Sequence, residues 1–286
     1  NHCVLCAIEG HVRKARSSNT PFSPEVVVKC LPQISSSLRL GDQEDAHEFL
    51  RGAIDAMQRS LPEDDPDRKR AYPFSLFTGS VQSCVQCLEC HNESIRIDPI
   101  EDLQLEIDHE SKLKSALNFY TRIESLSGDN RYACEHCGAK TDAQRYILIH
   151  ETPAILAVQL KRFSYWKRSA KIPHFVEYPE ELDLSPFMTA TSTSHDETES
   201  HGRTGAGATG YKGTGGKSTP AKVRASPRRP ESARTNRQER DFMILCAVVV
   251  HIGKTLSSGH YVAYVRTRDG WYRMDDASVV KTTRQE

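Results

Sequence analysis

The chain has 286 residues, which exceeds one average domain and is long enough to bury a sizeable core. Lysine plus arginine and aspartate plus glutamate both number 38, so no net charge draws the chain onto nucleic acid or an anionic membrane. The longest apolar run, residues 242–250, is strand-sized and far shorter than the roughly 18 residues of a spanning helix. Membrane proteins, collagen-like repeats and strongly basic nucleic-acid binders are therefore excluded.

The chain contains nine cysteines, and several of them occur in closely spaced pairs. The first residues show no secretory signal, and a chain of this size does not need disulfides to stay folded. Paired cysteines in a reducing compartment indicate metal binding or catalysis. We therefore expect an intracellular protein, in the cytoplasm, the nucleus or both.

The first 70 residues are expected to be mainly helical. Helices are predicted over 4–16 and from Pro24 toward Leu31. Apolar residues recur at steps of three and four from Gln43 to Met57, which predicts a helix with one buried face and Asp42 as its N-cap.

Alternating and β-branched segments after residue 72 predict a change to β-structure. A break at residues 151–153 divides one long apolar stretch into two strands, and 111–117 is a short helical candidate. The predicted strand segments are 80–87, 94–107, 146–160 with that break, 242–250, 260–266 and 271–274.

Residues 189–240 have almost no large apolar side chains. Such a segment cannot offset the entropy lost on ordering, so we expect a disordered insert. Its second half is basic, which leaves open a transient anionic partner, although a solvated linker is the simpler interpretation.

Two cysteine pairs have the spacing of zinc knuckles, with 43 residues between the pairs. Four thiolates in two such pairs suit a closed, tetrahedral, structural zinc site. Cys84, His91 and His136 are alternative ligands, and four free buried thiols remain the alternative to any metal. The paired residues are Cys87, Cys90, Cys134 and Cys137.

A histidine and an acid lie at opposite ends of two consecutive predicted strands. His260 begins one strand and Asp275 ends the next, so the two side chains can meet across a hairpin. A base and the carboxylate that orients it need this arrangement. An ordinary surface contact is the competing interpretation.

Asp45 and Glu48 are three residues apart near the start of a predicted helix. This spacing places both carboxylates on one face, which suits binding of arginine side chains. Spacing alone favours a simpler role in a capped, solvated first turn.

Several motifs together resemble the ubiquitin-specific protease family of papain-like cysteine deubiquitinases. GDQEDAHEFL is similar to the family's thumb motif, and CLECHNES and NRYACEHC to the halves of its zinc finger. Further matches are the strand motif ILAVQLKRF and the histidine box, HIGKTLSSGHYVAYVR with WYRMDDASVV.

The resemblance implies an α+β, papain-like fold with a helical thumb, a zinc-bearing β finger and an antiparallel β palm. It divides the 286 residues into a thumb (1–70), a finger (71–150) and a palm (151–188 and 241–286), with the insert between them. By position, His260 matches the family's general base, Asp275 the acid that orients it, and Asp276 a residue that supports the oxyanion. Asp45 and Glu48 match residues that bind the C-terminal tail of ubiquitin. Gly259 and Tyr261 match residues that line the tunnel for ubiquitin's terminal glycines.

The same resemblance implies hydrolysis of isopeptide and peptide bonds after the C-terminal glycine of ubiquitin. Ubiquitin and ubiquitinated proteins would be the partners, Zn²⁺ the structural cofactor, and the chain a monomer that binds neither membrane nor nucleic acid.

The family's cysteine box is not matched by this sequence. NHCVLC, with Cys3 and Cys6, is similar to sequence that follows the box, so we expect a domain that is incomplete at its N-terminus and inactive as given. A ubiquitin-binding protein without catalysis is the second hypothesis. A zinc-ribbon nucleic-acid binder, which would use the basic insert, is a third; the balanced charge argues against it.

Overall fold

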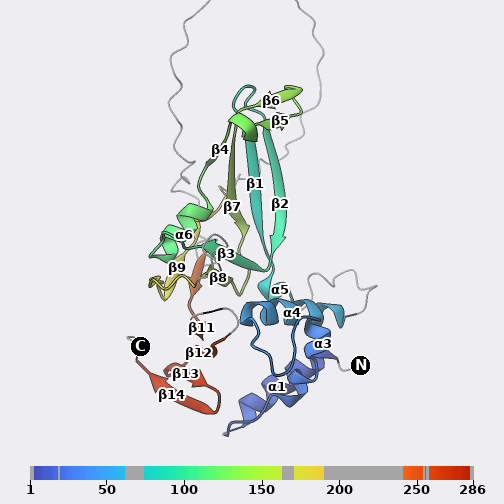
Figure 1. The fold of residues 1–286 in the computed structure, drawn as a ribbon, viewed down its shortest axis with the longest axis vertical. Coiled ribbons are helices and arrows are strands. Elements are labelled where there is room, and N and C mark those ends of the chain that lie inside the picture. Colours follow the sequence, from blue (N-terminus) through green and yellow to red (C-terminus); the bar gives the residue numbers. More distant parts are fainter. Residues whose placement is uncertain are drawn as a thin grey trace, which may run out of the picture.

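A computed structural model describes residues 3–18, 20–61, 74–162, 171–189, 241–253, 255 and 258–283. Three parts follow one another along the long axis: helices and a small sheet at one end, a mixed core in the middle, and a long sheet that tapers to a tip (Figure 1). We call the helices the thumb, the mixed core together with the small sheet the palm, and the long sheet the finger. Within the described part of the chain, no helix has both the length and the apolar character needed to cross a bilayer.

The thumb is built from five helices around one apolar cluster. α1 and α4 contribute most of the cluster, whose buried members include Val4, Cys30 and Ile54. The helices are α1 (Val4–Ser17), α2 (Glu25–Val28), α3 (Leu31–Ile34), α4 (Ala46–Arg59) and α5 (Phe74–Phe77). The predicted helix over 4–16 is confirmed.

The start of α4 corrects one prediction. Asp45, and not Asp42, is the N-cap: its Oδ1 accepts the backbone N–H groups of His47 at 2.7 Å and Glu48 at 3.4 Å. Gly41 has a φ of 95°, so the chain turns here and the helix starts later than the periodicity suggested.

The finger is a four-stranded antiparallel sheet in the order β2-β1-β7-β4, with a small hairpin of β5 and β6 at its tip (Figure 1). Because β1 pairs with β7, the two halves of the finger come from distant parts of the sequence. The strands are β1 (Gly79–Cys87), β2 (Glu93–Ile100), β4 (Glu124–Leu126), β5 (Tyr132–Cys134), β6 (Ala139–Thr141) and β7 (Ala143–Glu151), with a 3-10 turn at Gly128–Asn130.

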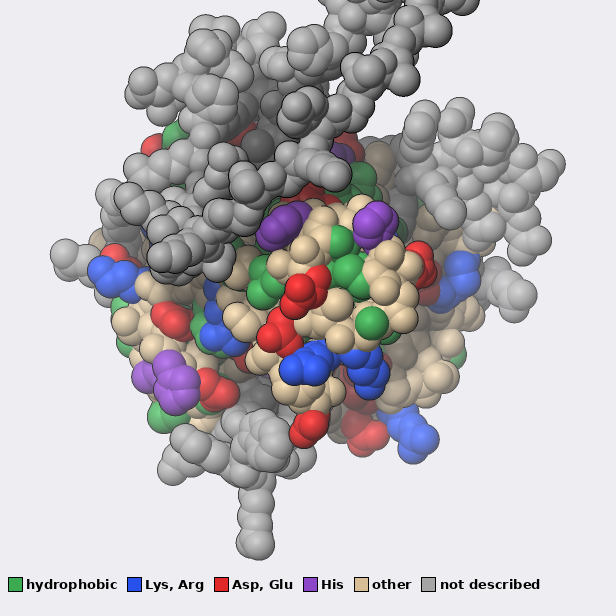
Figure 2. Space-filling model, turned by 90° about the horizontal axis from the view of Figure 1, so that it is seen from above, with side chains coloured by type: hydrophobic (Ala, Val, Ile, Leu, Met, Phe, Trp, Pro, Cys, Tyr) green, Lys and Arg blue, Asp and Glu red, His purple; other side chains and the backbone are tan. Residues whose placement is uncertain are grey.

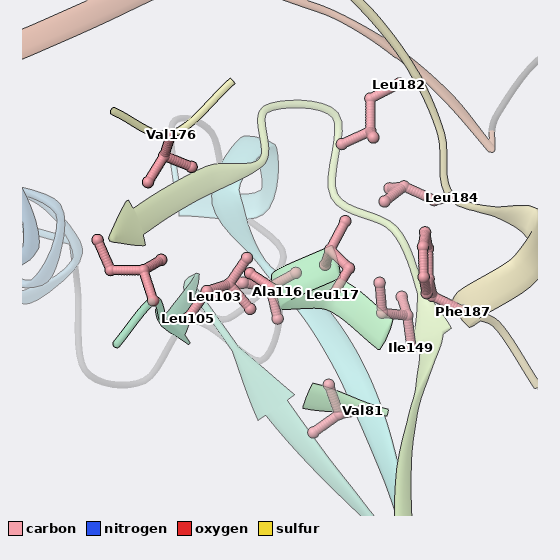
Figure 3. Packing of buried hydrophobic residues seen from close by; sticks show 11 residues of the cluster. Val81, Leu103, Leu105, Ala116, Leu117, Ile149, Val176, Leu182, Leu184 and Phe187 are labelled. Atoms are coloured by element: carbon pink, nitrogen blue, oxygen red, sulfur yellow. The ribbon is translucent and has the colours of Figure 1, made fainter. Parts of the chain in front are cut away.

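The palm core forms where the base of the finger meets α6 (Leu113–Tyr120), β3 (Asp102–Glu106) and β8 (Ala157–Lys161). β3 and β8 pair in parallel, so the palm is not antiparallel throughout as expected. The break predicted at 151–153 separates β7 from β8, as expected. Figure 3 shows side chains from these elements converging on one cluster. Its buried members are Val81, Leu103, Leu105, Ile107, Ala116, Leu117, Ile149, Val176, Leu182, Leu184 and Phe187.

The apolar run 242–250 forms two strands in two different sheets, although one strand was expected. β10 (Phe242–Ile244) pairs with β9 (Glu181–Asp183), whereas β11 (Ala247–Ile252) pairs with β12 (His260–Thr267). The run changes sheets between these strands, and nothing in its uniformly apolar composition marks that point. A 3-10 turn, Ser185–Phe187, follows β9.

β11 to β14 form an antiparallel sheet in sequence order beside the helices (Figure 1). β13 (Gly270–Asp275) pairs with β12 on one side and with β14 (Ser278–Thr282) on the other. The sequence predicted β12 and β13 but not β14.

The segment 189–240 lies outside the described residues except for Thr189. The Thr189 N–H donates to the Ile149 carbonyl at 2.9 Å, so the described palm extends one residue into the expected insert. The face in Figure 2 carries acidic, basic and histidine side chains intermixed, with no continuous basic patch among its described residues.

Candidate functional site

His260 and Asp275 meet across the β12–β13 hairpin, as predicted. His260 is the first residue of β12 and Asp275 the last of β13, and Nε2 lies 2.5 Å from Oδ1. The carboxylate holds the ring by Nε2, so Nδ1 is the nitrogen available to a reacting group. The His260 side chain is 45% exposed, which leaves it open to a substrate.

Arg273 binds the second oxygen of the same carboxylate, with Nη2 2.7 Å from Asp275 Oδ2. The two oxygens of Asp275 therefore have different partners, and the carboxylate cannot rotate without losing one of them. Sequence analysis missed Arg273, although its position two residues before the acid on one strand places it on the same face.

The charges of the pair stabilise each other. The Asp275 carboxylate raises the pKa of His260 above its ordinary value, chiefly through their hydrogen bond. The same hydrogen bond is the largest cause that lowers the pKa of Asp275. Asp276 has a φ of 49° and lies in the same group of ligating atoms, all within 4.8 Å of one another.

No cysteine belongs to this group, and all nine cysteines are among the described residues. Four lie at the finger tip, Cys30 and Cys84 are fully buried, and Cys246 is exposed after β10. Cys3 is the N-cap of α1, and its Sγ accepts the Cys6 N–H at 3.3 Å. Contact with the Cys6 thiol lowers the pKa of Cys3, and the bond from the Cys6 N–H adds to this effect.

The thumb reaches the histidine strand through the first turn of α4. Burial raises the pKa of the Tyr261 hydroxyl, and the nearby Asp45 carboxylate acts in the same direction, whereas the backbone of Ala46 acts against both. Asp45 also faces His251, which is the penultimate residue of β11. The structure thus brings Asp45 and Tyr261 together next to His260.

Asp45 and Glu48 have different partners in the structure. Because Asp45 is the N-cap, its carboxylate turns back onto the helix end. Glu48 instead accepts hydrogen bonds from the hydroxyls of Ser35, at 3.2 Å, and Ser37.

Glu48 lines an open groove of about 690 Å³ between the thumb and the palm. His47 crosses this junction, with Nε2 2.5 Å from Asp102 Oδ2 on β3. Burial raises the pKa of Glu101, which also lines the groove. The groove is lined by Ile34, Ser35, His47, Glu48, Arg51, Gly52, Asp55, Glu101, Gln104 and Gln159.

The finger tip brings the four predicted ligand cysteines together. Their sulfurs lie within 4.8 Å of one another; Cys87 Sγ is 3.8 Å from Cys137 Sγ, and Cys90 Sγ is 3.7 Å from Cys134 Sγ. Four Zn–S bonds of about 2.3 Å in a tetrahedron separate sulfurs by about 3.8 Å. The donor set and its dimensions therefore fit a closed Zn²⁺ site.

The two cysteine pairs have matching backbone turns. The His91 N–H donates to the Cys87 carbonyl at 3.0 Å, and the Gly138 N–H to the Cys134 carbonyl at 2.9 Å. His91 and Gly138 both have positive φ, 59° and 65°. Each turn directs its two thiols to one point.

The four thiols do not ionise alike. The Cys90 N–H and the Thr141 hydroxyl lower the pKa of Cys87 to about 6, whereas contact with the other three thiols raises that of Cys137 to about 12. Four thiolates at this distance repel one another unless a bound cation compensates them.

The alternative ligands lie outside the four-sulfur group. Cys84 is fully buried against Tyr146, and burial raises its pKa. Neither His91 nor His136 belongs to the group.

A histidine–aspartate pair beside a helical thumb, joined through a palm to a finger with four clustered thiols, is the architecture of a papain-like fold. A sequence profile of the family "Ubiquitin carboxyl-terminal hydrolase" matches residues 1–286. The chain belongs to this family.

Relatives in plants and humans have names that match this family. The chain is 33% identical over 289 residues to ubiquitin carboxyl-terminal hydrolase 17 of Arabidopsis thaliana, covering 97% of the chain and 33% of that protein. It is 30% identical to ubiquitin carboxyl-terminal hydrolase 17-like protein 13 of Homo sapiens, covering 97% of the chain and 44% of the relative. The chain thus spans about a third to under a half of these two relatives.

Solved structures share the fold. A SAGA DUB module of Ubp8, Sgf11, Sus1 and Sgf73 bound to monoubiquitin matches with a TM-score of 0.72 and 24% identity, over 99% of this chain and 55% of that one. The corresponding module bound to ubiquitin aldehyde has a TM-score of 0.72 at 23% identity, over 99% and 56%.

Proposed function

We propose that the protein containing this chain is a thiol-dependent deubiquitinase that cleaves isopeptide and peptide bonds after the C-terminal glycine of ubiquitin. Family membership and the ubiquitin-bound fold relatives support this proposal. The observation that carries it is the 2.5 Å contact between His260 and Asp275 beside the helical thumb.

In the proposed reaction, His260 Nδ1 takes the proton of a cysteine thiol, and the thiolate attacks the carbonyl carbon of ubiquitin's last glycine. The tetrahedral intermediate collapses to a thioester as the imidazolium returns the proton to the leaving amine. Water, deprotonated by His260, then releases the ubiquitin carboxylate. Asp275 holds the ring, and Asp276 supports the oxyanion.

The C-terminal tail of ubiquitin would pass between thumb and palm. Glu48, which lines the groove, would bind an arginine side chain of the tail. Asp45, at the start of α4, would bind an arginine side chain there as well. Gly259 and Tyr261, on either side of His260 in the chain, would line the passage for the terminal glycines. The cysteines 87, 90, 134 and 137 would hold a structural Zn²⁺, whose coordination shell they complete, so the metal takes no part in the reaction.

We further propose that this chain by itself binds ubiquitin without cleaving it. No described cysteine joins the group around His260. The same observation favours the second candidate function, in which the whole protein is a non-catalytic ubiquitin binder. The division into a thumb (1–70), a finger (71–150), a palm (151–188 and 241–286) and an insert (189–240) remains part of the proposal; within 71–150, α5 packs with the thumb, and β3 and α6 pack in the palm core.

Ubiquitin carrying a thiol-reactive electrophile at its C-terminus tests whether the chain binds ubiquitin and whether it has a catalytic thiol. The 286-residue chain is mixed with this probe, and the intact mass is read alongside ubiquitin affinity by calorimetry. We expect binding but no adduct; Cys246→Ser is the control for the exposed thiol outside the site. An adduct mapped to Cys3 or Cys6 overturns the proposal of an inactive chain.

Absence of ubiquitin binding by a folded, zinc-loaded chain would contradict the proposed function itself. To separate a deubiquitinase from a non-catalytic binder, the full-length protein is treated with the same probe. A His260-dependent adduct supports the enzyme, and lack of an adduct supports the binder.

A further inference from the structure

Lys171 makes contacts that the proposed mechanism does not use. Its Nζ lies 2.6 Å from the His251 carbonyl oxygen, 3.0 Å from the Gly253 carbonyl oxygen and 3.3 Å from His251 Nδ1. An ammonium group has three N–H donors and no acceptor, so these three acceptors match its hydrogen-bonding capacity. Lys171 is therefore bound at one point to both the backbone and the side chain at the end of β11.

These contacts determine the state of the His251 ring. An ammonium group can only donate, so Nδ1 of His251 must accept, and the ring proton must lie on Nε2. The ring is then neutral. Burial and the charge of Lys171 lower the pKa of His251 below its ordinary value, in agreement with a neutral ring, while Asp45 acts in the opposite sense.

The far side of the same ring supports the residues beside His260. A Cβ added to Gly259 would lie 2.0 Å from His251 Nε2, so the ring occupies the space of a side chain at that position. The ring also lies against Tyr261, with centroids 4.9 Å apart. Gly259 and Tyr261 flank His260, and Ile252 pairs with His260 in the β-ladder.

We propose that Lys171 is a positioning residue for His260. Its ammonium group fixes His251 as a neutral ring with its proton on Nε2, and that ring holds Gly259 and Tyr261 in place. The binding part of this inference rests on the proposed function, because Gly259 and Tyr261 line the proposed passage for the ubiquitin tail.

The charged and titratable groups around this contact come from three elements. Asp45 from the thumb and Tyr261 from β12 face His251. Arg162 faces Lys171, and it donates to the His174 carbonyl at 3.0 Å, so it holds the segment that carries Lys171.

Nitrogen-15 NMR of the histidine rings in the 286-residue chain tests the proposal. In the wild type we expect His251 to carry its proton on Nε2 and to titrate below its ordinary pKa. In Lys171→Met, we expect a mixture of tautomers, a raised pKa of His251 and at least tenfold faster amide exchange at Gly259. The matched control is Lys161→Met, which removes only the 3.6 Å ion pair with Glu106 and should leave His251 unchanged.

Ubiquitin affinity is the second measurement. We expect Lys171→Met to weaken binding about tenfold, because Gly259 and Tyr261 in the proposed tail passage lose their support, and Lys161→Met to leave it unchanged. Unchanged affinity in Lys171→Met overturns the positioning role, as does an unchanged tautomer and pKa of His251.

If Lys171→Met fails to fold, the wild type decides alone: a His251 proton on Nδ1 overturns the proposal, and a proton on Nε2 supports it. Failure of the wild type to bind ubiquitin would contradict the proposed function. The ring measurements would then still decide the role of Lys171.

Discussion

The tip of the finger and the core of the palm are stabilised in different ways. Strands β5 and β6 at the tip are three residues long, and their buried side chains are Cys134 and Thr141. The palm instead buries a continuous cluster of large apolar side chains, including Leu105 and Leu117. We therefore expect the tip to depend on bonds from its four thiolates to the proposed Zn²⁺ and the palm to depend on the hydrophobic effect. A change in one region should then spare the other.

Replacing a cysteine at the tip should produce the largest effect. Cys134→Ser should release the zinc, because structural Zn²⁺ sites contribute on the order of 10 kcal/mol and need all four ligands. We expect about one zinc per chain in the wild type and almost none in the variant by elemental analysis. Hydrogen exchange should increase in β5 and β6 but not in α6.

Cys246→Ser is the matched control, because Cys246 is an exposed cysteine outside the four-sulfur group. Zinc retained at full occupancy in Cys134→Ser would contradict the four-cysteine site. Global unfolding of that variant would show that the palm depends on the tip.

Truncating a palm residue tests the opposite side of the comparison. Leu117 on α6 is 1% exposed, and Leu117→Ala should lower the free energy of unfolding by about 2–5 kcal/mol. Denaturant unfolding measures the loss. The zinc content of the folded variant should stay at the wild-type value, and a fall would link the two regions.

Two variants should move the pKa of His260 in opposite directions. Asp275→Asn removes the largest cause that raises this pKa, so the pKa should fall. Arg273→Met removes a nearby positive charge and its bond to Asp275, so the pKa should rise. NMR titration of the ring measures both shifts. A fall in Arg273→Met would mean that Asp275 turns away from His260 once its second oxygen is free.

The same pair gives a pH dependence of stability. The raised pKa of His260 gives stability that is present below its ordinary value of about 6.5 and lost as the pH rises through the raised value. The lowered pKa of Asp275 gives stability that is present above its ordinary value of about 3.9 and lost as the pH falls through the lowered value. Asp275→Asn should therefore reduce the Tm most between about pH 4 and 6.5.

The smallest expected effects concern the two positive-φ turns. His91 has a left-handed backbone conformation in the first turn, and His91→Gly removes the strain of a side chain there. This change should raise the free energy of unfolding by between a few tenths of a kcal/mol and about 1 kcal/mol. Gly138→Ala introduces the same strain in the second turn and should destabilise it by about 1 kcal/mol. Thermal unfolding of the zinc-loaded variants checks both signs, and equal signs would contradict the equivalence of the turns.

Features encoded by short sequence patterns were predictable. The cysteine pairs carry their own turns, so their spacing predicted both knuckles, and the geometry of a hairpin places His260 at Asp275 once both strands are recognised. Contacts between distant segments were not predictable. Lys171 lies between β8 and β9, and it meets His251 and Gly253 at the end of β11 only in the folded chain. No local pattern marks a lysine whose acceptors are backbone carbonyls.

Prediction from sequence also failed where one sequence pattern is compatible with two different local structures. Asp42 and Asp45 both precede the apolar periodicity of α4; in the structure a turn at Gly41 comes first, and Asp45 is the cap. Residues 242–250 are apolar whether they form one strand or two, because the change of sheet depends on the partners of each half.

The pairing of β1 with β7 has a consequence for synthesis of the protein. β1 is complete roughly sixty residues before its partner, so it leaves the ribosome with one edge unpaired. At 5–20 residues per second, β7 follows after a delay on the order of 3 to 13 s. During that interval the nascent chain presents an unpaired strand edge, which can pair with another chain and so exposes the protein to misassembly while it is being made.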